Sequence, residues 1–293
     1  MGEIRIGTAS WSNRTLLESG WYPRAADTPA KRLAHYADQF PIVEVDTTYH
    51  GPPAARTAAL WAERTPPGFT FDVKAFSLLT GHPTQPDALS PDMRPTTGRR
   101  FVYPKDLSPR DYQEVWDRFL EGLDPLVDAD KLGVVLFQYP PWFTYGDVNA
   151  WQLLEAAERC APRRIAVEFR HASWFEGDRR AETLAFLRRH DLPLVCVDMP
   201  QGHRNSVPPV VEATADIAVV RFHGHSRQWA NRDVDERYRY LYNDRQLSQW
   251  ARHLRALAER TEEVHVLLNN CCADNAQRNA ARLRELLGVV TIL

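Results

Sequence analysis

Polar side chains close a series of short apolar runs in this sequence, at positions where a charge needs a compensating partner. Glu44 ends the run Ile-Val-Glu, and Glu168 ends the run Ile-Ala-Val-Glu. A charge in such surroundings is costly unless it pairs or meets water or a ligand. The residues placed in this way are Glu44, Lys74, Gln138, Glu168, Asp198, Arg221 and Asn270. Because they recur at the ends of successive runs, they favour one functional cluster over scattered structural ion pairs.

This cluster would supply both anion-binding groups and proton carriers. Lys74, Arg170 and Arg221 would hold a phosphate or a carboxylate, because an arginine offers two parallel N–H donors to such a group. Glu168 or Glu44 would then carry the proton. Burial raises the pKa of a carboxyl group and a neighbouring arginine lowers it, so the two glutamates could be split into an acid and a base. Two such glutamates also fit sugar cleavage, which stays an alternative.

Two histidines follow the same runs and add further proton carriers. His223 precedes Gly224, which would let the backbone approach a ligand, so we expect a functional role for His223. For His171 a ligand contact and a structural brace are equally open. Because histidines are few and Lys74 and Arg221 would repel a cation, we expect no tightly bound metal. A weak magnesium site made by carboxylates and a substrate phosphate stays open.

Aromatic side chains lie in the segments beyond these runs, and several could stack on a base or a sugar. The substrate-binding candidates among them are Trp11, Trp174, Tyr238 and Tyr242. Residues 232–245 form the most nucleic-acid-like stretch, because Arg232, Arg237, Arg239 and Arg245 alternate there with tyrosines. The acidic residues of the same stretch favour a solvated, ion-paired loop instead.

Each apolar run is followed by a helical stretch, which is typical of parallel strands joined by crossover helices. The predicted strands are 4–7, 42–46, 69–74, 133–138, 165–168, 194–198, 218–222 and 264–268. Eight such units in 293 residues predict an α/β fold, a single (β/α)8 barrel of the TIM type that spans residues 1–293 as one domain. Such barrels place their chemistry at the carboxyl ends of the strands, where the polar residues above would meet.

Helix signals fit this arrangement. Thr28 and Pro29 supply a cap and a first-turn proline for a helix over 30–39, and Asp147 is expected to cap a helix over 148–160. Further helices are predicted over 109–123, 248–260 and 274–287, whereas 202–214 is too rich in proline for one. The connection after the third strand is much longer than the others. Its proline-rich residues 77–108 are predicted to form an insertion at the rim of the active site.

Composition limits the functional classes. Lys and Arg number 36 against 38 Asp and Glu, which excludes the strong positive field of a nucleic-acid coat protein. Four cysteines without a C-x-x-C pair favour a reduced, cytoplasmic setting. The amino terminus does not read as a signal peptide, and no run of eighteen apolar residues occurs, so we expect no contact with membranes.

Several motifs run in order along nearly the whole chain. They include Gly7-Thr8 with Ser10-Trp11, Val43-Glu44-Val45-Asp46, Leu136-Phe137-Gln138-Tyr139-Pro140-Pro141, Val167-Glu168-Phe169-Arg170-His171, Arg221-Phe222-His223-Gly224 and Asn269-Asn270. Through them the chain resembles the domain of unknown function 72 group, DUF72, also called YecE-like proteins. The resemblance implies a TIM-type barrel with shared polar residues at its strand ends, and it supplies no established reaction. Leu268 stands where that family usually has an aromatic residue, so we expect the eighth loop to differ in shape.

The sequence therefore predicts a hydrolase or lyase that acts on a phosphorylated or nucleic-acid-derived substrate through Glu168, Glu44 and His223. The residues expected to bind the substrate are Lys74, Gln138, Arg170, His171, Trp174, Asp198, Arg221, Asn270, Trp11, Tyr238 and Tyr242. The expected partner is an anionic or polar small molecule, or a nucleic acid. A non-catalytic protein that binds nucleic acid or nucleotides and a glycoside-cleaving enzyme are the alternatives.

Overall fold

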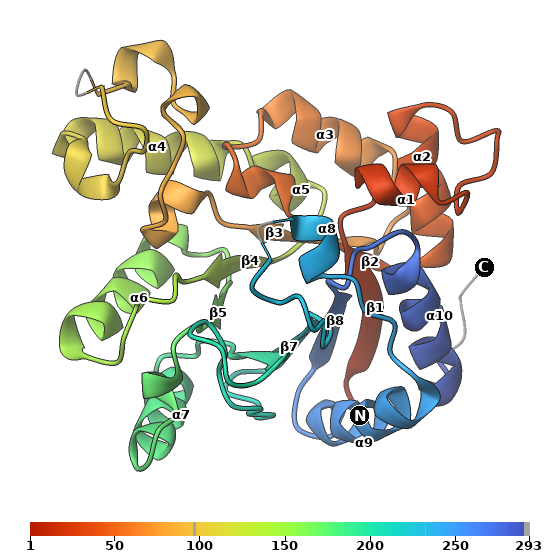
Figure 1. The fold of residues 1–293 in the computed structure, drawn as a ribbon. Coiled ribbons are helices and arrows are strands. Elements are labelled where there is room, and N and C mark those ends of the chain that lie inside the picture. The colour runs from red at the N-terminus through yellow and green to blue at the C-terminus, as the bar shows by residue number, and fades with distance from the viewer. Residues whose placement is uncertain (96–97, 232, 290–293) are drawn as a thin grey trace.

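A curled sheet of parallel strands forms the centre of the protein, and helices surround it (Figure 1). The computed structural model describes residues 1–95, 98–231 and 233–289. Within these ranges the strands are β1 (Glu3–Ala9), β2 (Ile42–Val45), β3 (Thr70–Lys74), β4 (Leu132–Gln138), β5 (Ile165–Glu168), β6 (Val195–Asp198), β7 (Ile217–Phe222) and β8 (Glu263–Leu268). Each lies where the sequence predicted a strand, so the prediction of a TIM-type α/β barrel is confirmed.

The barrel closes at a seam between β5 and β6. The strand order is β5-β4-β3-β2-β1-β8-β7-β6, and every neighbouring pair is parallel. In the described part of the chain, the two end strands are joined by one isolated bridge between Val167 and Leu194. The Val167 N–H donates to the Pro193 carbonyl there, at 2.8 Å. The barrel is therefore nearly closed, with little backbone pairing at this one position.

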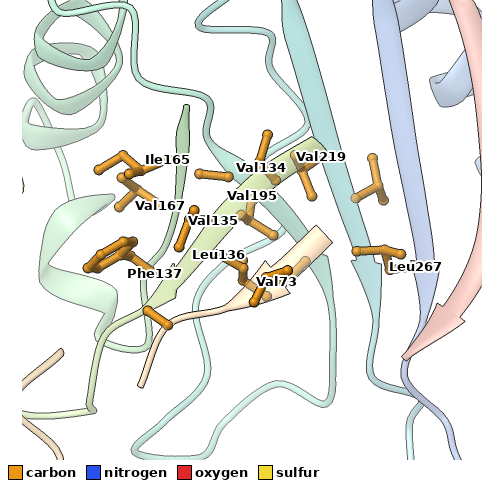
Figure 2. Packing of buried hydrophobic residues seen from close by; sticks show 14 of the residues in the cluster. Val73, Val134, Val135, Leu136, Phe137, Ile165, Val167, Val195, Val219 and Leu267 are labelled. Carbon is orange, nitrogen blue, oxygen red and sulfur yellow. The ribbon is translucent and has the colours of Figure 1, made fainter. Parts of the chain in front are cut away.

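Successive side chains along the strands are buried, as expected for strands covered on both faces. Val134, Val135, Leu136 and Phe137 of β4 are all fully buried. Figure 2 shows part of this core, in which they lie beside Val73, Ile165, Val167, Val195, Val219 and Leu267. This packing fixes the strands and therefore the positions of the polar residues at their carboxyl ends.

Helices cover the outside of the barrel and begin near the predicted positions. They are α1 (Arg14–Glu18), α2 (Pro29–Gln39), α3 (Ala55–Glu63), α4 (Pro109–Glu121), α5 (Asp124–Asp128), α6 (Asp147–Cys160), α7 (Arg179–Arg189), α8 (Val234–Arg237), α9 (Asp244–Ala258) and α10 (Asn275–Leu287). The Thr28 hydroxyl accepts a hydrogen bond from Lys31 N–H, as its predicted capping role requires. The prediction that Asp147 caps α6 was wrong, because the helix begins at Asp147 itself. Helix α9 begins four residues earlier than predicted, since Asn243 and Gln246 form a capping box.

The proline-rich insertion after β3 forms a series of 3₁₀ turns. They span Ser77–Thr80, Pro86–Ala88, Pro91–Met93 and Pro104–Asp106. An antiparallel bridge between Thr84 and Val102 ties the two ends of the insertion together, with hydrogen bonds of 3.0 and 2.8 Å. No helix within the described ranges is long and apolar enough to cross a membrane. All four cysteines are free thiols.

Candidate functional site

Strand register decides which strand-end residues face the interior of the barrel. Successive side chains point to opposite faces, and residues paired across parallel strands point to the same face. Gln138 pairs with Glu168, and Glu44 pairs with Asp72, which lies two residues before Lys74. The contacts below extend this inward-facing set to β7. The predicted residues that converge inside the carboxyl end of the barrel are Glu44, Lys74, Gln138, Glu168, Arg170, Arg221 and His223.

A buried layer of ion pairs, centred on Arg221, lies across the barrel. The Nε and Nη2 atoms of Arg221 donate to the two carboxylate oxygens of Glu44, at 2.8 and 2.6 Å. Its Nη1 donates to one oxygen of Glu168, and Arg170 Nε donates to the other. Arg170 also donates to Gln138 Oε1 at 3.2 Å. The side chains of Arg221, Glu44 and Glu168 are at most 1% exposed, so these pairs are formed away from water.

His223 belongs to the same buried layer. Its Nε2 lies 3.0 Å from Arg170 Nη2 and 3.3 Å from Glu168 Oε1, and its Nδ1 lies 2.9 Å from the side-chain amide of Asn269. A guanidinium can only donate, so His223 Nε2 accepts from it. Burial, together with the charge of Arg170, lowers the pKa of His223 to about 3. The ring is therefore a neutral imidazole at ordinary pH.

The ion pairs define what the two glutamates can do. Burial works to raise the pKa of Glu168, but Arg170 and Arg221 hold it well below its usual range. Burial raises the pKa of Glu44, against the opposing charges of Arg221 and Lys74. Both carboxylates bond to one guanidinium. They are therefore better suited to a fixed layer of ion pairs beneath a site than to the roles of a separate acid and base.

A second set of polar side chains lies toward the mouth of the barrel and stays partly exposed. It comprises Asp46, Lys74, Gln138 and Asn269. Lys74 Nζ lies 4.6 Å from the centroid of the Tyr49 ring, and it has neither a hydrogen bond nor a salt bridge with the described residues. Burial and the nearby Arg221 lower the pKa of Lys74 to about 8. Lys74 is thus a cation whose hydrogen-bond donors are not used by the described residues.

Asp46 lies two residues beyond Glu44 and carries the accessible carboxylate of this set. Burial raises the pKa of Asp46, and the charge of Lys74 opposes that rise. Its carboxylate forms no salt bridge or side-chain hydrogen bond within the described ranges. Asp46 therefore has the exposure and the raised pKa that Glu168 lacks.

Aromatic rings lie at the mouth, and the ring of Tyr49 contacts Lys74. Tyr49 contacts His82, with ring centroids 5.4 Å apart, and His82 contacts Trp142 at 6.0 Å. Tyr238, which follows α8, lies 6.2 Å from the ring of His223. The segment after β7 therefore reaches over the ion pairs, and α8 is drawn in front of the strands in Figure 1.

Asp198 faces the outside of the barrel. It pairs in register with Phe222, whose ring packs against Trp250 of α9. Its Oδ2 accepts a hydrogen bond from the Tyr242 hydroxyl at 2.5 Å and lies 2.9 Å from His225 Nε2. These bonds hold the segments after β6 and β7 together, so Asp198 and Tyr242 brace loops and do not join the inward-facing cluster.

Asn269 and Asn270 also divide between the two faces. Asn270 Nδ2 donates to the Tyr240 carbonyl at 2.8 Å and to Asn279 Oδ1, on α10, at 3.0 Å. Asn269 turns inward to His223. The member of the pair that joins the cluster is thus Asn269, and the prediction of Asn270 as a substrate-binding residue was wrong in its direction.

Three further predicted substrate contacts are occupied by packing or loop contacts. Trp174 is 1% exposed and stacks on Phe169, with centroids 4.3 Å apart. Trp11 packs against α3 on the outside of the barrel. His171 Nδ1 lies 2.8 Å from the hydroxyl of Ser173 in its own loop, as a structural brace would.

The site contains residues that sequence reasoning passed over. Asp46 and Asn269 adjoin the apolar runs that end in predicted site residues. Strand alternation, counted from Glu44 or His223, is the signal that points to them. His82 comes from the insertion after β3, where no periodic pattern marks it.

The described residues show no metal cluster at the site, and a cavity lies at the other end of the barrel. In the described residues no group of three or more His, Cys, Asp or Glu could hold a metal ion, and the weak magnesium site stays a prediction. A cavity of about 480 Å³ opens at the opposite end of the barrel, beside Arg164, Asp216 and His265. Several charged groups there pair with one another, as Arg164 does with Asp216.

The basic stretch after β7 is largely satisfied by its own loop. Arg232 lies outside the described residues. Arg237 donates to the Asn231 carbonyl at 2.7 Å, and Arg239 pairs with Glu236 at 2.7 Å. The ion-paired interpretation of this stretch therefore fits its geometry.

Comparison with known proteins identifies relatives along the whole chain. The family described as "Protein of unknown function DUF72" matches residues 5–291. A Bacillus subtilis protein described as "UPF0759 protein YunF" is 33% identical, over 98% of this chain and 95% of its own length. Crystal structures of DUF72 proteins are also similar. One from Enterococcus faecalis has a TM-score of 0.80 at 27% identity and covers 98% of this chain and 96% of its own. One from Thermotoga maritima has a TM-score of 0.79 at 29% identity and covers 98% and 99%.

Proposed function

The chain belongs to the DUF72 family, and we propose that it is an enzyme of the hydrolase or lyase type that acts on a phosphorylated or nucleic-acid-derived substrate. The observation that carries the proposal is the state of Lys74. Its ammonium group lies at the mouth of a barrel, beside ion pairs that already neutralise one another. Lysine binds phosphate groups as a point charge, and this one has all its donors available.

A charge count leaves Lys74 and Asp46 to set the charge of the mouth, which is neutral when Asp46 is ionised and positive when Asp46 is protonated. Arg170 and Arg221 carry two positive charges, and Glu44 and Glu168 carry two negative charges. Lys74 is left with Asp46 as the nearby carboxylate that can vary its protonation. An incoming phosphate would bind the ammonium group without having to break the buried pairs, whose disruption is costly.

Asp46 is the proton carrier that this arrangement favours in place of Glu168, Glu44 or His223. A general acid or base works best when its pKa lies near the working pH, and burial moves the pKa of Asp46 in that direction. Glu168, Glu44 and His223 would then hold the charges of Arg170 and Arg221 in place. In this assignment Lys74 binds the anionic group, and Asp46 exchanges a proton with the reacting part of the substrate.

The test measures turnover and binding in matched variants. Release of phosphate, or cleavage, is followed for a panel of nucleotides, sugar phosphates and short oligonucleotides that contain abasic sites. For any substrate found, we expect Lys74→Met to raise KM at least tenfold and Asp46→Asn to lower kcat about a hundredfold. Lys31→Met, on the exposed face of α2, is the control. Turnover that survives both site variants would remove the assignment.

Non-catalytic binding of nucleic acid is the outcome to be separated from this proposal. Affinity for a polyanion falls steeply between about 50 and 200 mM salt, whereas affinity for a small phosphate ester changes much less. Steep salt dependence without turnover would therefore favour the binding protein.

A further inference from the structure

His82 is held at the mouth of the barrel by the insertion that follows β3. Its side chain comes directly after the 3₁₀ turn Ser77–Thr80 and is 7% exposed. Its ring lies between Tyr49, at 5.4 Å, and Trp142, at 6.0 Å. Because the ring of Tyr49 lies against the Lys74 ammonium group, His82 is part of the same mouth as the proposed anion site.

Hydrogen bonds within the insertion assign the proton on the His82 ring. The Thr80 hydroxyl lies 2.8 Å from His82 Nδ1 and donates to the Ser77 carbonyl at 3.1 Å. A hydroxyl has one hydrogen to give and the carbonyl can only accept, so both hydrogen bonds form together only when Thr80 accepts from His82 Nδ1–H. The proton therefore sits on Nδ1, and Nε2 carries a lone pair.

The Nε2 atom has no hydrogen-bond partner in the part of the chain that the structure describes. Burial comes first in keeping the ring neutral, and the charges of Lys74 and Arg170 add to it, lowering the pKa of His82 to about 3. A neutral ring with its proton on Nδ1 makes Nε2 an acceptor. The mouth already holds the donors of Lys74 and the carboxylate of Asp46, and His82 adds a neutral acceptor to it.

The insertion is built to hold this ring in one place. The Ser77 hydroxyl lies 2.8 Å from the Thr84 hydroxyl, and both residues are buried. Thr84 in turn pairs with Val102 through two backbone hydrogen bonds. Both flanks of His82 are therefore anchored, which is what a residue that discriminates between ligands requires.

We propose that His82 Nε2 accepts a hydrogen bond from a hydroxyl or N–H group of a ligand whose phosphate binds to Lys74. The ligand class is then a phosphate ester that carries such donors, a sugar phosphate or a nucleotide, rather than a simple phosphate. The inference rests on the proposed function, because it takes the phosphate to lie at Lys74. It makes the insertion after β3 the element that determines specificity.

The experiment compares ligands with and without the donor groups by titration calorimetry of the full chain. The probes are methyl phosphate, glycerol 3-phosphate, ribose 5-phosphate and adenosine 5′-monophosphate. We expect at least one hydroxylated ester to bind tenfold or more tightly than methyl phosphate. His82→Phe, which keeps the ring contacts and removes Nε2, should abolish that preference and leave the affinity for methyl phosphate within twofold.

Two further variants make the result specific. His82→Asn keeps a donor toward Thr80 but has no atom at the Nε2 position, so it should lose the same preference even if His82→Phe folds poorly. His50→Phe is the control, because exposed His50 contacts the same Tyr49 ring at 5.2 Å. An unchanged preference in both His82 variants would overturn this inference alone, provided that methyl phosphate binding still depends on Lys74. If none of the probes binds the unaltered chain, the proposed function fails together with it.

Discussion

Arg221 holds both carboxylate oxygens of Glu44 across the barrel, although 177 positions separate the two residues in the sequence. The same guanidinium bonds to Glu168, so one side chain joins β2, β5 and β7. An ion pair of this kind need not stabilise a protein relative to apolar residues, but the loss of one partner leaves a buried charge without compensation. Removal of any single charge from this layer beneath the candidate site would therefore leave another buried charge without a partner.

We expect Arg221→Met to lower the free energy of unfolding by about 3–5 kcal/mol, because two buried carboxylates lose their shared partner. Denaturant unfolding measures this loss. Arg164→Met is the matched control, since the side chains of the Arg164–Asp216 pair are 40% and 36% exposed and the pair should contribute about 1 kcal/mol or less. Equal losses in the two variants would contradict the account of the buried layer.

Anion binding should weaken as the pH rises through the range in which Lys74 loses its proton. The pKa of Lys74 is lowered to about 8, and a bound anion will move it upward. The affinity for methyl phosphate, measured by calorimetry between about pH 7 and pH 10, should therefore be constant at first and then fall by up to tenfold per pH unit. Lys74→Met should bind weakly, without this decline. A decline that persists in the variant would assign the titration to another group.

His265 should make stability depend on pH at the other end of the barrel. Its Nδ1 lies 3.0 Å from both oxygens of Asp72, and its Nε2 lies 2.9 Å from Glu263. Burial opposes protonation, but the two carboxylates outweigh it and raise the pKa of His265 to about 9. A raised pKa contributes stability that is complete below the unfolded value of about 6.5 and is lost as the pH rises through about 9.

The measurement is the difference in unfolding free energy between the unaltered chain and His265→Gln. This difference should be about 3 kcal/mol larger at pH 6 than at pH 10. Taking the difference removes the contribution of Lys74, whose lowered pKa changes stability in the opposite direction over the same range. A difference that does not change with pH would show that His265 is not protonated in the folded protein.

Asn269 and Asn270 should separate binding from stability. Asn270→Ala removes the donor to the Tyr240 carbonyl and to Asn279, and we expect a stability loss of about 1–2 kcal/mol with phosphate-ester affinity unchanged. Asn269→Ala should change that affinity instead, because Asn269 lies beside His223 at the mouth. Thermal unfolding and calorimetry on both proteins give the two readouts, and the opposite pattern would reverse the assigned faces.

The sequence was sufficient for the barrel and for the inner part of the site. Buried parallel strands appear in the sequence as apolar runs, so each strand could be located from its run. A polar residue at the end of such a run stands out for the same reason. Glu44, Glu168 and Arg221 were found in this way, and they do meet.

The side of the barrel wall toward which a strand-end side chain points could not be predicted so easily. Asp198 and Asn270 end apolar runs just as Glu168 does, yet register turns them toward the helices. The mutual pairing of the charges was also hidden, because it depends on Arg221 reaching across the barrel. His82 gave no signal, since 3₁₀ turns with proline at their starts follow neither the helical nor the strand period.

The single bridge at the seam between β5 and β6 has a consequence for motion. A ring of strands opens where the fewest backbone bonds must break, and here that is the isolated bridge between Val167 and Leu194. Glu168 follows Val167 directly, so a transient opening of the ring would bring water to one end of the Arg221 ion pairs. The part of the barrel wall next to Glu168 should therefore open most readily. The amide protons of β5 should exchange with solvent before those of β1 and β8.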